Sequence, residues 1–152
     1  MHRLFPAALV AAVTVSACSL PTIDKEADAK ARTLFEQVRT QADLGANADL
    51  APDLRTPEAL AQLAGMRNAL PPGAPTAAAL RSWNAYSGTG GSRTNLIHAY
   101  SYPGRTVLAE TVLTKGKDGA WRIVGFHLTF EDGAPGQGDK PALTVTEKPQ
   151  DI

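Results

Sequence analysis

The sequence predicts an α+β domain in which two helices precede a four-stranded antiparallel meander. Apolar residues first recur at intervals of three and four, the period changes to two from about Ala78, and short Gly- and Pro-rich segments separate the alternating stretches. The chain has 152 residues, which suits one domain. Basic and acidic residues number 15 each, and this neutral balance argues against a nucleic-acid partner, which a basic surface would attract.

Residues 1–17 are typical of a signal peptide. Arg3 gives a positive start, and an uncharged apolar run from Leu4 to Val15 follows. That run is shorter than the roughly 20 residues that a membrane-spanning helix needs. It closes on small residues before Cys18, the only cysteine, so the chain cannot form an intrachain disulfide.

The segment Val15-Ser16-Ala17-Cys18 resembles the lipobox of bacterial lipoproteins. The resemblance implies that cleavage leaves Cys18 as the first residue, with a diacylglycerol on its thiol, and that residues 18–23 form a lipidated tether. It also implies a cell-envelope protein that the lipid holds at a membrane. Ser19 after the cysteine, in place of aspartate, implies the outer membrane and a domain that faces the periplasm. Two or three acyl chains hold a protein durably at a bilayer, whereas one does not.

The domain is predicted to span residues 24–131 and to begin with a long helix over 24–42. Its apolar residues share one face, so this face packs on the rest of the domain. Asp24 suits the N-cap, and Gly45 with Asn47 ends the helix. The apolar face comprises Ala27, Ala31, Leu34, Phe35, Val38 and Ala42.

A second helix is predicted to start at Thr56-Pro57-Glu58, because threonine caps a helix and proline suits its first position. Pro71-Pro72-Gly73 ends it. The segment from Leu44 to Arg55 is predicted as a loop or a short helix.

Four strands are predicted over about 79–87, 93–102, 105–115 and 120–130, joined by short turns into hairpins. We expect Tyr102 opposite Arg105 and Lys117 opposite Ala120, and strict alternation then fixes the faces. The face expected to receive the long helix holds Leu96, His98, Tyr100, Tyr102, Val107, Ala109, Leu113, Val124, Phe126, Leu128 and Phe130. The other face holds Asn95, Ile97, Ser101, Thr106, Leu108, Glu110, Val112, Trp121, Ile123, His127 and Thr129. Residues 132–152 are predicted to be a flexible tail, in which 142–147 can add an edge strand.

Two helices followed by a meander that ends in Asp118-Gly119-x-Trp121 and Val124-Gly125-Phe126 resemble the nuclear-transport-factor-2-like (cystatin-like or SnoaL-like) superfamily. Phe35 and the strands 95–102 and 105–114 also carry this resemblance, which covers about residues 24–130. It implies a curved sheet wrapped around the long helix, with a cone-shaped cavity in many members. The superfamily hosts enzymes, binding proteins and dimerisation modules, so the resemblance does not by itself identify a function.

Four residues are candidates for lining such a cavity: Trp83, His98, Tyr100 and Phe126. His98 in this setting is either a base in a pocket or a core histidine whose nitrogens are hydrogen-bonded. Aromatic residues in a domain of this size also serve the core itself. An apolar cavity would suit a small apolar ligand.

Glu110 and His127 are predicted to lie opposite each other on neighbouring strands. A carboxylate that orients an imidazole can make it a general base. The same pair can also be a simple cross-strand surface contact.

No cofactor or metal site is predicted, because two histidines without neighbouring carboxylate or thiolate ligands do not make a zinc set. The favoured hypothesis is a lipid-anchored, non-enzymatic binding or assembly module, with an envelope protein or a second copy of the chain as partner. The alternatives are a carrier of a small apolar ligand and, less favoured, an enzyme that uses His98 or the Glu110–His127 pair.

Overall fold

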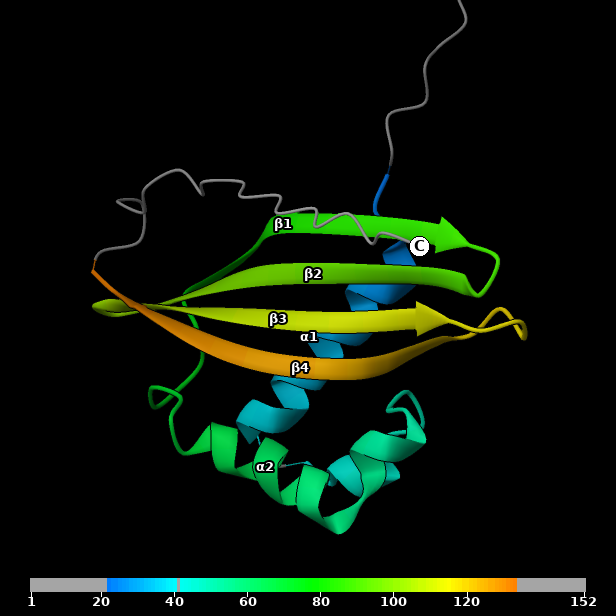
Figure 1. Cartoon of the computed structure of the whole chain (residues 1–152). Coiled ribbons are helices and arrows are strands. Elements are labelled where there is room, and N and C mark those ends of the chain that lie inside the picture. Colours follow the sequence, from blue (N-terminus) through cyan, green and yellow to red (C-terminus); the bar gives the residue numbers. More distant parts are fainter. Residues whose placement is uncertain (1–21, 41, 134–152) are drawn as a thin grey trace, which may run out of the picture.

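A computed structural model describes residues 22–40 and 42–133, and in it two helices lie on one side of a four-stranded antiparallel sheet (Figure 1). The strands follow in sequence order β1-β2-β3-β4, so the predicted α+β class and the meander are confirmed. The helices are α1 (Lys25–Thr40) and α2 (Pro57–Arg67), and two short 3-10 helices lie between them at Leu44–Ala46 and Pro52–Arg55. The strands are β1 (Ala77–Gly88), β2 (Gly91–Tyr102), β3 (Arg105–Lys115) and β4 (Trp121–Asp132).

Helix α1 is shorter than predicted, with 16 residues and an end at Thr40 rather than at residue 42. The Asp24 carboxylate caps its start by accepting from the backbone N–H groups of Glu26 and Ala27. At the other end, the N–H of Ala42 donates to the carbonyl of Gln37, five residues back. A bond of this span closes a helix C-terminus and does not continue the α-helical ladder. At 16 residues, α1 is not the long helix that was predicted.

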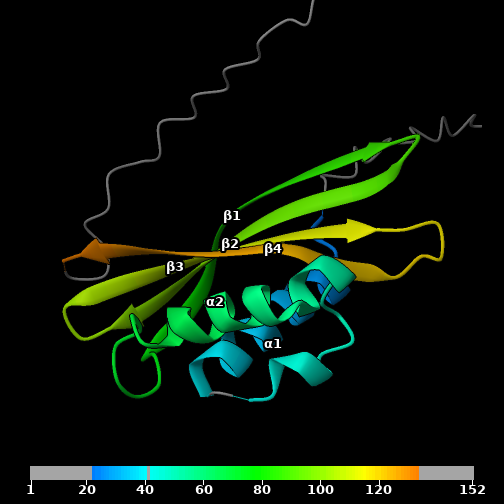
Figure 2. The ribbon, with the colours of Figure 1, turned by 60° about the horizontal axis from the view of Figure 1, so that its bottom comes forward.

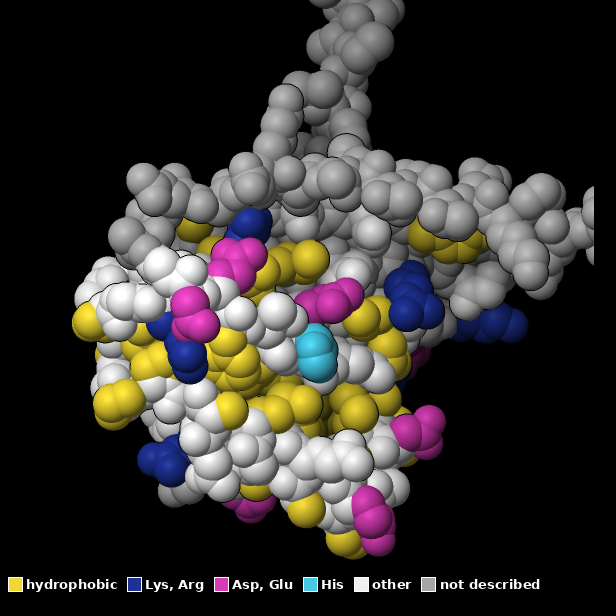
Figure 3. All heavy atoms as spheres, turned by 60° about the vertical axis from the view of Figure 1, so that its left-hand side comes forward, with side chains coloured by type: hydrophobic (Ala, Val, Ile, Leu, Met, Phe, Trp, Pro, Cys, Tyr) yellow, Lys and Arg dark blue, Asp and Glu magenta, His cyan; other side chains and the backbone are white. Residues whose placement is uncertain are grey.

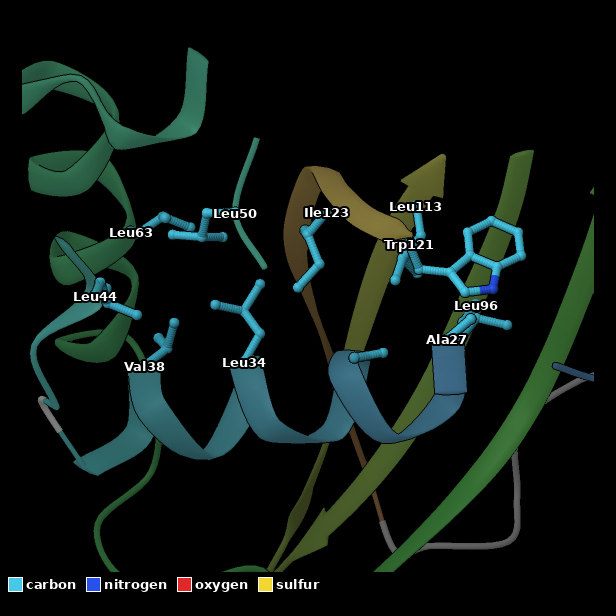
Figure 4. Close-up of a cluster of buried hydrophobic side chains, with 11 residues drawn as sticks. Ala27, Leu34, Val38, Leu44, Leu50, Leu63, Leu96, Leu113, Trp121 and Ile123 are labelled. Atoms are coloured by element: carbon cyan, nitrogen blue, oxygen red, sulfur yellow. The ribbon is translucent and has the colours of Figure 1, made fainter. Parts of the chain in front are cut away.

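The core lies between α1 and the inner face of the sheet. The ring of Phe35, which is fully buried, stacks on Tyr100 of β2 with ring centroids 3.5 Å apart and an angle of 7° between the planes. Figure 4 shows the rest of the α1 face directed at the sheet and, toward the helix C-terminus, at α2. The larger buried cluster comprises Ala27, Ala31, Leu34, Val38, Leu44, Leu50, Leu63, Leu96, Leu113, Trp121 and Ile123.

The register between β2 and β3 is as predicted, with Tyr102 opposite Arg105. Between β3 and β4 the prediction is wrong near the turn, where Lys115 pairs with Trp121, one residue away from the expected register. Val124 is an extra residue on β4 between the pairs of Leu113 with Ile123 and Val112 with Gly125, which is a β-bulge. Beyond this bulge the predicted register is restored.

The bulge reverses three predicted facings. Trp121 and Ile123, expected on the outer face, are 5% and 0% exposed in the core, whereas Val124, expected inside, is 38% exposed. Strict alternation fails at a bulge because the inserted residue shifts every side chain on one side of it to the other face. Trp121 thereby joins the core beside the start of α1.

Among the residues that the structure describes, strand β1 is an edge of the sheet and is weakly covered; the edge strand predicted at 142–147 lies outside them. None of its residues is buried, and only Leu80 and Trp83 are half-buried. Figure 2 shows both helices on one side of the sheet and the β1–β2 hairpin bending away from them toward its tip. The guanidinium of Arg81 reaches the carboxylate of Glu131 on β4 at 2.6 Å, so the two edge strands approach each other through their side chains. Across the described part of the chain, no helix has the length and apolar character to span a bilayer.

We predict that replacing Phe35 with alanine lowers the free energy of unfolding by about 3–5 kcal/mol, because it removes a fully buried ring and leaves a cavity beside Tyr100. Phe35→Leu should lose less, since it retains part of the volume. Urea unfolding followed by circular dichroism measures both changes.

The matched control is Tyr86→Ala, which removes an aromatic ring that is 72% exposed. It should change the stability by no more than about 0.5 kcal/mol. Equal losses at positions 35 and 86 would show that α1 does not pack on the sheet in this way.

Candidate functional site

The inner face of the sheet holds a buried polar cluster between α1 and β2. His98 projects from β2 toward α1 and is 1% exposed. Its Nε2 lies 2.8 Å from Oδ1 of Asp28 on α1. The other carboxylate oxygen of Asp28 accepts from Nε of Arg32, one helical turn further on, at 2.9 Å. The three side chains form a chain of hydrogen bonds from the helix surface into the core.

Burial is the main influence on His98 in this cluster. It lowers the pKa of the imidazole below its ordinary value of 6.5, together with the nearby positive charge of Arg32, and the hydrogen bond to Asp28 opposes this shift only in part. For Asp28, burial favours the protonated acid, but hydrogen bonds from Arg32 and His98 outweigh it and lower the pKa of the carboxyl. The folded state therefore favours a neutral imidazole that donates to an ionised carboxylate. This arrangement ties α1 to β2 and gives the ring almost no contact with solvent.

Tyr100 lies next to His98 on the inner face, with 6.2 Å between the ring centroids. Its hydroxyl is buried and has no hydrogen-bond partner within the described residues, and burial raises the pKa of this phenol. Phe126 on β4 is half-buried and packs against both buried clusters, the larger one and the one that contains Phe35. Three of the four predicted cavity residues thus lie under α1.

Trp83, the fourth predicted cavity residue, packs against the larger buried cluster and also lines a cleft at the tip end of the β1–β2 hairpin. We name this the hairpin-end cleft, and its volume is about 210 Å³. The second tryptophan, Trp121, forms part of its wall, and Lys115 lies with its Nζ 5.4 Å from the centre of the Trp121 ring. The cleft is lined by Thr22, Asp24, Trp83, Ala85, Tyr86, Ser87, Ser92, Arg93, Thr94, Lys115 and Trp121.

Glu110 and His127 lie directly opposite each other on β3 and β4, as predicted. The Glu110 carboxylate accepts from Nδ2 of Asn95 at 2.6 Å, and this contact holds it on the β2 side. His127 is exposed and borders a hollow of about 120 Å³ beside the β4 edge, together with Met66, Ala69, Leu128 and Phe130. On the side of the molecule drawn in Figure 3, a histidine lies at the surface among apolar side chains.

A further hollow, about 560 Å³, lies where both helices end, and it is lined by Arg39, Thr40, Arg67, Asn68, Leu70 and the turn 71–73. The two arginines of this hollow both make contacts with helix groups, one within α1 and one between α2 and α1. Arg39 pairs with Glu36 at 2.5 Å, and Nε of Arg67 donates to the backbone carbonyl of Arg39 at 3.1 Å. That bond satisfies a carbonyl at the end of α1 and ties the two helices together.

Asp28 and Arg32 were not predicted as partners of His98. A signal was present, because these residues are four apart and each directly follows an inward-facing alanine, Ala27 or Ala31. A charged pair on the flank of an apolar helix face can reach a polar group on the sheet beneath it. Over residues 22–40 and 42–133, no three side chains of the types that bind metal come together.

We predict that acid destabilises the fold through His98. The unfolded chain takes up this proton at a higher pH than the folded chain, because folding lowers the pKa of His98. The contribution to stability is therefore complete above about pH 6.5 and is lost as the pH falls below it, by at most about 1.4 kcal/mol per pH unit. Urea titrations from about pH 8 to pH 5 measure this slope, and Asp28, whose pKa is lowered from 3.8, adds its own loss only at lower pH.

In His98→Gln this slope should disappear, since glutamine can still donate to Asp28 but does not titrate. His127→Gln is the matched control and should retain the wild-type slope, because His127 is exposed. A slope that survives in His98→Gln and vanishes in His127→Gln would contradict the assignment.

Comparison with known protein families, with curated proteins and with solved structures finds no match to this chain. The α+β class follows from the elements themselves. The resemblances to bacterial lipoproteins and to the nuclear-transport-factor-2-like superfamily stay predictions.

Proposed function

We propose that this protein is a bacterial envelope lipoprotein, anchored through Cys18, whose domain acts as a non-enzymatic binding or assembly module. The lipobox-like segment 15–18 supports the anchor. The observation that carries the non-enzymatic part is the burial of His98, which is 1% exposed and hydrogen-bonded to Asp28. A general base needs contact with the proton it removes, and this imidazole has none.

The second candidate pair gives an enzyme no better support. Glu110 is engaged with Asn95, so it is not oriented to hold the imidazole of His127. His127 is itself exposed on the sheet edge. Catalysis gains most from groups that are held in place and shielded from water, and His127 has neither advantage.

The carrier alternative places an apolar ligand between helix and sheet. In the described structure Phe35 stacks on Tyr100 in that space, and Phe126 packs beside them. This packing favours the binding module over a carrier with a cavity in the domain centre.

We propose that this fold belongs to the nuclear-transport-factor-2-like superfamily. The support is the arrangement of two helices on one face of a four-stranded meander with a β-bulge.

Strand β1 is the surface that best suits a binding module. It is a 12-residue edge strand, and none of its residues is buried. Unpaired edge strands offer backbone N–H and C=O groups to another chain, and natural proteins usually protect them with charges, proline or short length. β1 contains only one charged residue, Arg81, and no proline. We propose that an envelope protein, or a second copy of this chain, adds a strand here.

We predict that Cys18→Ser abolishes lipid attachment, because serine offers no thiol to the diacylglycerol. Mass spectrometry of the processed N-terminus and recovery in the membrane fraction measure the effect. Ser19→Ala is the control and should remain acylated and membrane-bound. Normal acylation and membrane recovery of the Cys18→Ser protein would overturn the proposal.

We predict that a photo-crosslinking residue at Ala79, exposed on β1, forms a defined adduct in intact cells. The same residue at Asp53, exposed on a 3-10 helix away from the edge strand, is the matched control and should yield little. Equal yields at both positions, or an adduct at position 53 alone, would contradict β1 as the docking edge.

A further inference from the structure

We propose that the end of the domain that carries both hairpin tips and the start of α1 docks on the anionic surface of the membrane that holds the lipid anchor. This inference rests on the proposed lipidation of Cys18. We call this region the hairpin end, and it comprises residues 22–26, 83–94 and 115–122. It is an interaction surface for anionic lipid headgroups, and it shares residues 83–88 with β1.

Strand register and one ion pair bring these segments together. Ser92 of β2 pairs with Lys115 of β3, and Lys115 in turn pairs with Trp121 of β4, so both hairpin tips lie at the same end of the sheet. The start of α1 reaches the same place, because Nζ of Lys115 lies 3.7 Å from the Asp24 carboxylate. Figure 1 shows the two tips at the same end of the sheet, with the first turn of α1 behind β1 and β2.

Aromatic side chains gather at this end. Both tryptophans of the chain line the hairpin-end cleft. Trp83 is half-buried, whereas Trp121 is 5% exposed and belongs to the core, so Trp83 and Tyr86 are the aromatic residues that a bilayer can contact. Tyr86 is the most exposed large hydrophobic side chain of the described residues, at 72%. Tryptophan and tyrosine favour the membrane–water interface, since each has an apolar body and a polar group.

Unpaired positive charge gathers at the same end. Within residues 22–40 and 42–133, Lys25, Arg93 and Lys117 are exposed and form no ion pair. Most other described cations pair with a carboxylate, and Arg55 and Arg67 are the exceptions. The hairpin end also contains Asp24, Glu26 and Asp118, so with five basic and three acidic residues its formal net charge is +2 in a nearly neutral chain. Such cations attract an anionic lipid surface within about one Debye length.

The tether brings this end to the bilayer. Thr22 lines the hairpin-end cleft and follows Cys18 by only four residues. Four residues of extended chain span at most about 14 Å. An acylated Cys18 therefore places the aromatic and basic side chains of the hairpin end within reach of the headgroups, and anionic headgroups neutralise the unpaired cations.

The test uses the mature lipidated protein inserted in vesicles and the fluorescence of its two tryptophans, both of which report on the hairpin end. The vesicles are made of phosphatidylcholine alone or with phosphatidylglycerol, and each contains a phosphatidylcholine with a nitroxide on its headgroup. Docking should increase nitroxide quenching in the phosphatidylglycerol vesicles. High salt should reverse this increase, because it screens surface charge.

The triple variant Lys25→Gln, Arg93→Gln, Lys117→Gln should lose the increase. One basic residue near an anionic surface is worth roughly fivefold, so three should lower the ratio of docked to undocked domain by about 100-fold. The matched control is Arg55→Gln, Arg81→Gln, Arg105→Gln, which removes the same charge elsewhere and should retain the increase.

Equal quenching with and without phosphatidylglycerol, or equal loss in both triple variants, would overturn the docking surface while leaving the anchor intact. Flotation of the protein with the vesicles distinguishes a loss of docking from a loss of the lipid anchor, on which the proposed function depends. A protein that does not float with vesicles lacks the anchor, which would overturn the lipoprotein proposal and this inference with it.

Discussion

The packing of α1 on the inner face of the sheet is the interaction on which the rest of the structure depends. Phe35 stacks on Tyr100, and the other apolar residues of α1 meet side chains from β2, β3 and β4. Each buried aromatic or aliphatic side chain of this kind contributes about 1.5–3 kcal/mol, a large share of the 5–15 kcal/mol by which domains are stable. All of these side chains are buried at once only if α1 packs closely against the sheet.

This packing also determines what the polar residues of the inner face do. His98 and Asp28 meet under α1 because the helix lies close to β2, and the same closeness removes the imidazole from solvent. A buried hydrogen bond between a helix and a strand helps to fix the position of the helix on the sheet. The accessible features therefore lie elsewhere, on the β1 edge and at the hairpin end.

The elements of this fold could be predicted from local signals. Asp24 and Thr56 cap the two helices as expected, and the Pro103-Gly104 turn sets the register of β2 with β3. The bulge at Val124 could not be predicted, because the alternation of inward and outward residues along a strand does not show where an extra residue is inserted. Burial of the large Trp121 and Ile123 side chains is the gain that accompanies the insertion.

The candidate site was harder to predict, because its contacts join residues far apart in the sequence. His98 and Asp28 are 70 positions apart, and the sequence around each residue does not indicate that the other is its partner. Trp83 packs against the larger buried cluster and lines the hairpin-end cleft, and its place in that cleft depends on the second hairpin and the start of α1, which are distant in sequence. The pairing of Glu110 with His127 followed from register alone, whereas the contact of Glu110 with Asn95 required side-chain positions.

Helix α1 covers the inner face of the sheet, and beneath it His98 ties β2 to α1 with almost no contact with solvent. Nuclear magnetic resonance of the His98 ring in the folded protein tests this most directly. The account predicts a neutral ring with its proton on Nε2, slow exchange of that proton with water, and a pKa below the ordinary 6.5. A ring that exchanges rapidly and titrates at its ordinary pKa without loss of the fold would contradict it.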